Sequence, residues 1–185
     1  MNVVLRSVST ALLILIWHAS PAVAAEADVD DLEAVARDGA ISISLQLKGA
    51  LDRPETIESL QSGLPVAIVY QFDLIRKREN WFDRILSSSE IELVATYNSL
   101  TREYLLNYRR DRKLVSSQSI RTVEELRRRM TTIREEALLS LGTHRPGDLR
   151  VRARAVLGRR YLLHVIPRAI ATEWDVVRVE TGATR

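Results

Sequence analysis

The sequence predicts an α+β fold that is mainly antiparallel β, built as a twisted meander sheet or a sandwich-like arrangement with about two packed helices. At least six segments alternate apolar and polar residues, as half-buried strands do. Only two segments with helical spacing separate them, which is too few for the crossovers of a parallel sheet. The 185 residues are 46% hydrophobic and 28% charged, a composition typical of one globular domain with its own core.

Residues 1–24 have the pattern of a cleavable signal peptide. Arg6 precedes a short apolar run over residues 11–17, and Ala22-Val23-Ala24 supplies a cleavage signature of small residues. A retained membrane anchor is the weaker alternative, because a membrane span needs about 20 apolar residues. We therefore expect an exported, periplasmic protein.

The rest of the chain is expected to form one domain. Residues 25–39 are acidic and are predicted to be a mobile lead-in, with a helix over 32–37 as the alternative. A single β-rich domain then covers 40–181, and residues 182–185 form a polar tail. Without the signal peptide, basic and acidic residues nearly balance, so we expect no nucleic-acid partner.

The alternating segments predict the strands of this domain. They cover residues 41–48, 66–78, 91–98, 104–113, 149–155 and 174–179, with a short segment over 114–120 that pairs beside the fourth. Between the first two strands, a short helix is predicted to begin at an Asp52 cap, with Pro54 in its first turn, and to end at Gly63.

A second helix is predicted over residues 123–137. Thr122 and Glu125 have the spacing of a capping box, and apolar residues then repeat at three and four positions over about four turns. The opposite face carries basic and acidic side chains, among them Arg127, Arg128 and Arg134.

The sequence contains no recognisable catalytic pattern. There is no cysteine, no Gly-x-Ser-x-Gly motif and no glycine-rich phosphate loop, so disulfides, thiolate metal sites and the common nucleophile motifs are excluded. His144 is expected to be exposed and His164 to be a partly buried strand or loop residue. We expect no metal, no cofactor and no enzyme activity. An enzyme of unfamiliar type is the weakest alternative, and it would require a cleft that holds His164 beside a carboxylate.

Three arginines share one face of the strand over 149–155. Arg150, Arg152 and Arg154 alternate with apolar residues, so their side chains lie about 6.6 Å apart along the strand. They could bind anionic headgroups or an acidic partner. The favoured interpretation is a solvated outer face with cross-strand pairs to Glu90, Glu92 or Glu103, since surface ion pairs are common.

Two basic runs fall at predicted strand ends. The first is Arg76-Lys77-Arg78, and the second contains Arg109 and Arg110. A meander of these strands would bring both runs to one positive end of the sheet, which could meet an anionic membrane surface or an acidic protein. Trp81 and Phe82 follow in a predicted turn. They are either an exposed anchor for a partner or, slightly favoured, a cap on the core.

The order and spacing of several short motifs resemble a bacterial family of small exported proteins, domain of unknown function 4390. The motifs are Gly63-Leu64-Pro65-Val66, Tyr70, Arg76-Lys77-Arg78, Trp81-Phe82-Asp83 and Leu100-Thr101-Arg102, with Tyr104, the late Arg-x-Arg strand and Trp174-Asp175. The likeness spans residues 41–180. It implies one β-rich domain without assigned catalytic residues. Family members are often encoded near membrane sensor kinases, which implies a role beside envelope signalling.

Two functions follow as expectations. The first is a non-enzymatic periplasmic interaction module that contacts a membrane protein, an envelope sensor or a membrane surface through the basic sheet end and Trp81-Phe82. The alternative is a carrier or sensor of a small amphiphilic ligand, in which the helix over 123–137 covers a curved sheet. The second function predicts a cavity behind that helix.

Overall fold

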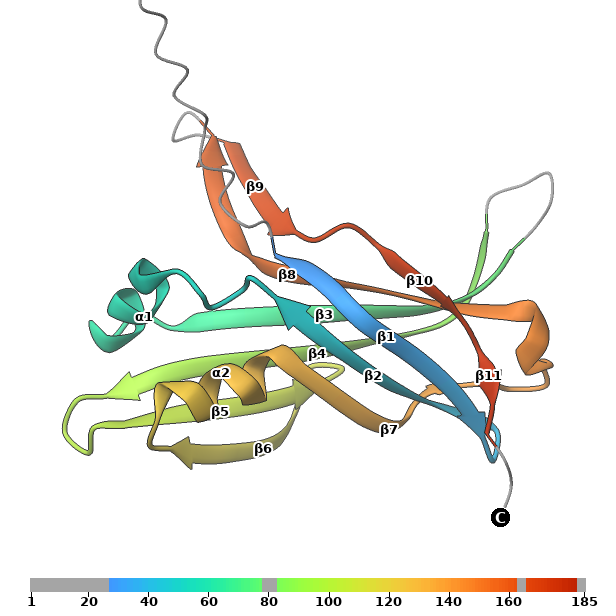
Figure 1. The fold of residues 1–185 in the computed structure, drawn as a ribbon, viewed down its shortest axis with the longest axis horizontal. Coiled ribbons are helices and arrows are strands. Elements are labelled where there is room, and N and C mark those ends of the chain that lie inside the picture. Colours follow the sequence, from blue (N-terminus) through green and yellow to red (C-terminus); the bar gives the residue numbers. More distant parts are fainter. Residues whose placement is uncertain (1–26, 78–82, 163–165, 183–185) are drawn as a thin grey trace, which may run out of the picture.

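The computed structural model describes residues 27–77, 83–162 and 166–182, and within them two sheets face one another (Figure 1). The larger sheet has the order β10-β8-β3-β4-β5-β6, with β9 beside β8, and the smaller has the order β11-β1-β2-β7. Apart from the parallel pair β1–β11, all pairs of strands are antiparallel. The predicted α+β, mainly antiparallel class is confirmed.

The elements have the following bounds. The larger sheet contains β3 (Val66–Arg76), β4 (Arg84–Asn98), β5 (Glu103–Arg110), β6 (Lys113–Ile120), β8 (Leu149–Leu162), β9 (Ile166–Ala171) and β10 (Asp175–Arg178). The smaller sheet contains β1 (Asp28–Arg37), β2 (Ala40–Lys48), β7 (Thr132–Ser140) and β11 (Glu180–Thr181). Two α-helices, α1 (Pro54–Gln61) and α2 (Val123–Thr131), and a short 3-10 helix, η1 (Pro146–Asp148), complete the described part.

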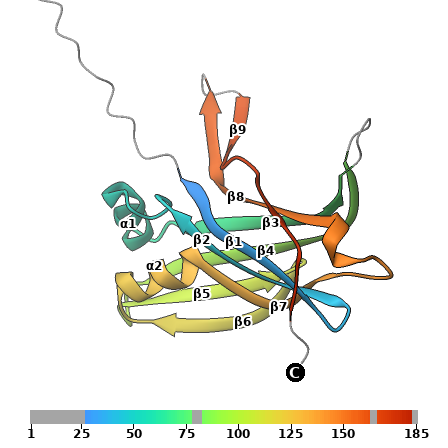
Figure 2. The same cartoon turned by 45° about the vertical axis from the view of Figure 1, so that its right-hand side comes forward.

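The core lies between the two sheets. The turned view shows that the strands of one sheet run at an angle to those of the other (Figure 2). On β3, every second residue from Ile68 to Leu74 is fully buried, and Tyr70 and Phe72 stack with ring centroids 6.4 Å apart. β3, β4, β5 and β6 pair in succession, so the predicted meander is present. β8 then adds to the free side of β3.

The predicted acidic lead-in is instead strand β1. Val29, Leu32, Ala34 and Ala36 are buried against the core, so these residues belong to the folded domain rather than to a mobile or helical segment. The register shifts between Asp30 and Glu33, where Asp31 adopts a φ of 52°. This bulge moves the buried positions from odd to even residue numbers, which hides the alternation on which strand prediction depends.

The second predicted helix is correct at its start and wrong at its end. α2 stops at Thr131, and residues 132–140 form β7, which pairs with β2. A register shift opposite Ile41/Ile43 and a φ of 51° at Ala137 mark a second bulge. Because of that bulge, the apolar residues of β7 follow spacings that resemble those of a helix, although Ala137 itself is exposed.

The two helix starts differ in their caps. At α2 the Thr122 hydroxyl accepts a hydrogen bond from the backbone N–H of Glu125 at 3.2 Å, as the capping box predicted. At α1 the cap residue is Arg53, without a side-chain hydrogen bond, and not Asp52. Pro54 occupies the first turn as expected. Proline is tolerated at this position because a backbone N–H there would have no hydrogen-bond partner within the helix.

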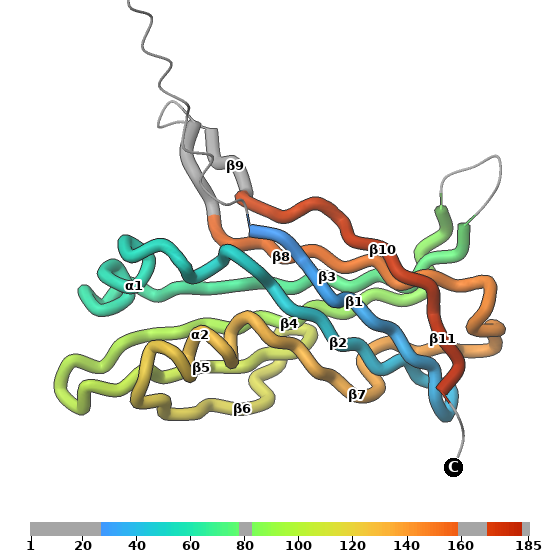
Figure 3. The backbone as a smooth tube through the Cα atoms, in the orientation of Figure 1, coloured from blue at the N-terminus to red at the C-terminus, as the bar shows by residue number. Residues whose placement is uncertain are grey.

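The chain joins the two sheets along one side of the sandwich, and we call the opposite side, where the outermost strands do not pair, the open side (Figure 3). The chain passes from β10, paired with β8, to β11, paired with β1, and the amide of Val179 donates to the Leu149 carbonyl at 3.1 Å on the way. β6 and β7 are the outermost strands of their sheets on the opposite side. They do not pair, and α2 connects them.

One sequence prediction falls outside the described residues, and several strands are longer than the sequence predicted. The signal peptide, residues 1–24, lies in the undescribed N-terminal part. β4 begins earlier than predicted and includes Ser87, β8 continues to Leu162, and β9 was not predicted. Neither α-helix of the described ranges is long and apolar enough to cross a bilayer.

Candidate functional site

A groove occupies the open side of the sandwich, between α2–β7 and the strands β4, β5 and β6. Its volume is about 980 Å³. Apolar side chains from four strands form its floor: Leu93, Leu106, Tyr108, Val115 and Ile133. Arginines of α2 and β7 lie along its rim, Arg127, Arg128, Arg129 and Arg134, together with Glu124 and Glu135. The groove therefore combines an apolar floor with a rim on which arginines outnumber carboxylates.

The floor follows from strand alternation on β4, β5 and β7. Leu93 lies opposite Tyr108, and both side chains point to the inner face of the large sheet. Leu106 and Ile133 are almost fully buried. Val115 of the outermost strand β6 remains 59% exposed although it lines the groove. The floor is thus continuous with the core at one side and open to solvent at the other.

Tyr108 places a polar atom on this floor. Its hydroxyl is buried, and no atom of the described residues forms a hydrogen bond with it. Burial is the main cause that raises the pKa of Tyr108, and the nearby Glu135 carboxylate raises it further. Burial beside the groove therefore keeps this phenol in its neutral form.

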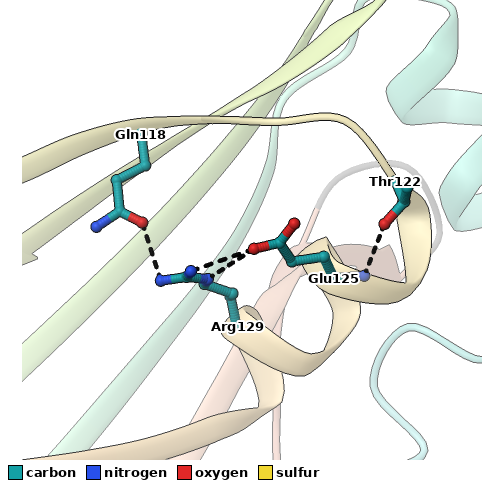
Figure 4. A network of polar contacts seen from close by, with 4 residues as sticks. All are labelled: Gln118, Thr122, Glu125 and Arg129. Atoms are coloured by element: carbon teal, nitrogen blue, oxygen red, sulfur yellow. Dashed lines mark hydrogen bonds and ion pairs between the residues drawn. The ribbon is translucent and has the colours of Figure 1, made fainter.

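Arg129 ties α2 to the edge strand β6 (Figure 4). Its guanidinium donates to the Gln118 side chain at 3.0 Å and to the Glu125 carboxylate at 3.1 and 3.3 Å. Arg127 donates to the Leu51 carbonyl at 3.2 Å. Two of the four rim arginines therefore hold the wall of the groove in place.

Arg128 and Arg134 differ from these two. Both side chains are exposed, and within the described ranges neither forms an ion pair. Their charges are therefore available to a bound anionic group.

The junction between α2 and β7 is fixed by polar contacts, one of them buried and two partly buried. The Tyr70 hydroxyl, on the inner face of β3, donates to the Met130 carbonyl at 2.7 Å. The Gln46 side chain of β2 donates to the Thr131 hydroxyl at 3.1 Å and accepts from the Thr132 hydroxyl at 2.7 Å. α2 is thereby held at a set position over the groove.

The three arginines of β8 lie on its outer face, as predicted, but their partners differ from those expected. Arg152 donates to Asp73 at 2.8 and 2.9 Å, and Arg154 donates to Gln71 at 2.9 Å. The Trp174 ring stacks on both guanidiniums, at 4.4 and 4.5 Å.

The prediction that these arginines pair with Glu90, Glu92 or Glu103 was wrong, because β8 lies next to β3 rather than next to β4 or β5. Arg150 lies opposite Ile75 on β3 and Arg178 on β10. Arg152 and Arg154 are therefore occupied by contacts within the fold.

The two basic runs do not form one positive end. Arg110 lies opposite Ile91, which lies opposite Tyr70, so the second run is level with a residue six positions before Arg76. At about 3.3 Å per residue this separates the runs by roughly 20 Å along the sheet. The β3–β4 ribbon simply extends past the end of β5, a stagger that sequence patterns do not reveal.

The second run is also engaged within the fold. Arg109 pairs with Glu92 at 3.1 Å, and Arg110 donates to the carbonyls of Ala137 and Leu138 at 2.8 and 3.1 Å. The interaction module proposed from the sequence therefore loses the joint basic end on which it depended.

The remaining candidates divide into two groups. The first group, Arg78, Trp81, Phe82 and His164, lies outside the described residues. His144 was expected to be exposed, but it is half-buried and its Nδ1 lies 2.8 Å from a guanidinium nitrogen of Arg76. Among the described residues, no three His, Asp or Glu side chains are grouped in a way that would hold a metal ion.

Sequence reasoning anticipated a cavity behind the second helix but not its lining. Arg128 and Arg134 were assigned simply to the helix's polar face, since the strand β7 was not recognised. The signal that could have identified the rim is the density of arginines over residues 127–134 beside an apolar helix face.

Comparison with known proteins agrees with the motifs. No curated protein and no solved structure matches the chain. The sequence model of the family described as Domain of unknown function (DUF4390) matches residues 24–177, which covers most of the chain and nearly all of its described strands. The chain belongs to the DUF4390 family.

Proposed function

We propose that this protein binds an amphiphile with a negatively charged group, and that the groove between α2–β7 and β4–β6 is its site. The observation that supports this most directly is a groove of about 980 Å³ with an apolar floor and an arginine-rich rim. Sites for small ligands generally have volumes of about 300–1,000 Å³ and combine apolar lining with a few placed polar groups.

The apolar part of the ligand would bind along Leu106, Val115 and Ile133. Each methylene removed from water contributes about 0.8 kcal/mol, so a chain of about eight methylenes would gain roughly 6 kcal/mol before the entropic cost of binding.

The charged part of the ligand would meet Arg128 and Arg134 at the rim. Guanidinium groups bind carboxylates and phosphates with paired hydrogen bonds, and these two are exposed beside the apolar floor. The predicted signal peptide would deliver the protein to the periplasm, where acyl chains with anionic headgroups are abundant in the adjoining membranes. No covalent chemistry is required by this function.

A fluorescent long-chain fatty acid and its alcohol analogue of equal length test the proposal by direct titration. Val115→Asp places a carboxylate on the floor and should weaken binding of the fatty acid at least tenfold. Leu100→Asp is the matched control, because Leu100 is 93% exposed in a turn and does not line the groove. This control should bind as the wild type does.

The rim is tested with the double variant Arg128→Gln and Arg134→Gln. It should weaken binding of the fatty acid several-fold and leave binding of the alcohol unchanged, because only the carboxylate needs the two cations. Equal binding of both probes by all variants, or no saturable binding by the wild type, would contradict the proposed function.

A further inference from the structure

A second polar site lies at the opposite end of the molecule from the groove. Arg76 is the last residue of β3 and follows Leu74 on the same side of the strand, opposite the fully buried Leu149 of β8. Its contact with His144 places the guanidinium beside the segment between β7 and β8 that carries η1. Together with Lys77, Thr143, His144, Arg145 and Asp148 it lines a cavity of about 480 Å³.

The Arg76 side chain is held but not neutralised. One of its terminal nitrogens lies 2.8 Å from His144 Nδ1, which is the contact expected when a guanidinium donates to a neutral imidazole. Its Nε is buried and has no hydrogen-bond partner among the described residues. A guanidinium carries five N–H donors in a planar fork, so most of this fork remains unused inside a polar cavity.

The surroundings add positive charge rather than compensate it. Arg84 lies directly opposite Arg76 across the β3–β4 pair, and like charges in that arrangement destabilise a sheet. Lys77 and Arg145 line the same cavity, and among the described residues that line it Asp148 is the one acidic side chain. In the described ranges, none of these four cations forms an ion pair with a carboxylate.

We propose that this cluster is a binding site for a phosphate-type oxyanion, with Arg76 as its central ligand and Lys77 and Arg145 as flanking cations. A tetrahedral oxyanion presents several acceptor oxygens, so it can pair with the unused fork of Arg76 and with both flanking groups at once. Its negative charge would also offset part of the positive charge that Arg76 and Arg84 bring together across the β3–β4 pair. The Thr143 hydroxyl offers a further donor at the same cavity.

The site is independent of the groove. Leu93, on the floor of the groove, lies opposite Ile68, and Arg76 lies eight residues further along β3, a distance of roughly 26 Å. The same oxyanion chemistry is presented by free inorganic phosphate and by the phosphate of a lipid headgroup. The two sources differ in whether a membrane surface must approach this end of the protein.

Two titrations at physiological ionic strength, where the Debye length is about 8 Å, separate these sources. The first follows the heat of binding of inorganic phosphate. The second follows co-sedimentation with vesicles of phosphatidylglycerol in phosphatidylcholine. Arg76→Gln should weaken binding of phosphate or of vesicles at least tenfold, in each titration in which the wild type binds.

Two further variants keep the test independent of folding. Arg145→Gln alters an exposed side chain and should weaken binding several-fold without affecting the fold. Arg53→Gln removes the same charge from an exposed position outside the cavity, and it should bind as the wild type does.

Binding of phosphate alone would identify a free oxyanion as the ligand, and binding of vesicles, with or without phosphate, would identify a headgroup. Absence of binding in both titrations would overturn the proposal. So would an equal loss in Arg53→Gln, because the interaction would then depend only on total charge.

Discussion

The hydroxyl of Tyr70 should stabilise the fold by completing the end of α2. The last carbonyls of a helix have no donor within the helix, and Met130 is the penultimate residue of α2. Tyr70 supplies the missing donor from β3 at 2.7 Å. Both residues are 0% exposed, so no water can replace this hydrogen bond when it is removed.

Tyr70→Phe should therefore lower the free energy of unfolding by about 1–3 kcal/mol, the cost of a buried acceptor left without a partner. With a urea dependence of about 2 kcal/mol per molar, a loss of 2 kcal/mol moves the unfolding midpoint by about 1 M. Tyr97→Phe is the control. Tyr97 is half-buried, and its hydroxyl makes no hydrogen bond within the described ranges.

The pH dependence gives a second readout of the same hydroxyl. Burial raises the pKa of Tyr70 far above its ordinary value, whereas the unfolded phenol ionises near pH 10. The contribution of Tyr70 is therefore complete below about pH 10 and declines as the pH rises further, because only the unfolded chain gains by ionising. The difference between wild type and Tyr70→Phe should narrow by about 1.4 kcal/mol between about pH 9 and about pH 11.

Urea unfolding followed by circular dichroism at both pH values tests this reasoning. A difference between wild type and Tyr70→Phe below about 0.5 kcal/mol at neutral pH is the size of an ordinary surface substitution and would refute it. A difference that stays constant with pH would show that the stabilisation does not come from the neutral, buried phenol.

Two other substitutions test local features of the fold by the same unfolding measurement. Thr122→Ala removes the hydroxyl that accepts from the Glu125 amide and should cost about 1 kcal/mol; an unchanged midpoint would mean that the cap contributes nothing. Asp73→Asn breaks the ion pair with Arg152, in which the Asp73 side chain is 13% exposed and the Arg152 side chain 27% exposed. It should lower the free energy of unfolding by about 1–3 kcal/mol. Asp30→Asn breaks an exposed pair and should leave stability nearly unchanged, so equal effects of the two would contradict the importance of burial.

The central strands could be predicted because their alternation is uninterrupted. β3 buries every second residue from Ile68 to Leu74, and this pattern is visible in the sequence alone. β1 and β7 could not be predicted because each contains a bulge, marked by Asp31 and by Ala137 with φ values near 50°. A bulge shifts the buried face by one residue, and period-two reasoning then fails within a single strand.

The candidate sites depended on information that alternation does not contain. Alternation correctly placed Arg152 and Arg154 on one outer face, but their partners Asp73 and Gln71 follow from β8 lying next to β3. The two basic runs would have met only if β3 and β5 ended level. Strand order and stagger are set by packing across the whole sheet, and a local pattern of residues does not specify them.

The open side of the sandwich is a consequence of how the chain connects β6 to β7. A direct hairpin between two such strands would need a turn of as few as two residues and would pair their edges. The chain instead inserts α2, whose nine residues extend over about 13 Å, and Thr122 caps its start while Tyr70 completes its end. The helix therefore keeps the two edges apart at the place where a turn would close them, and the arginines on α2 and β7 lie along the opening that results. A groove produced by a capped and anchored helix is a built feature of this fold rather than a packing defect.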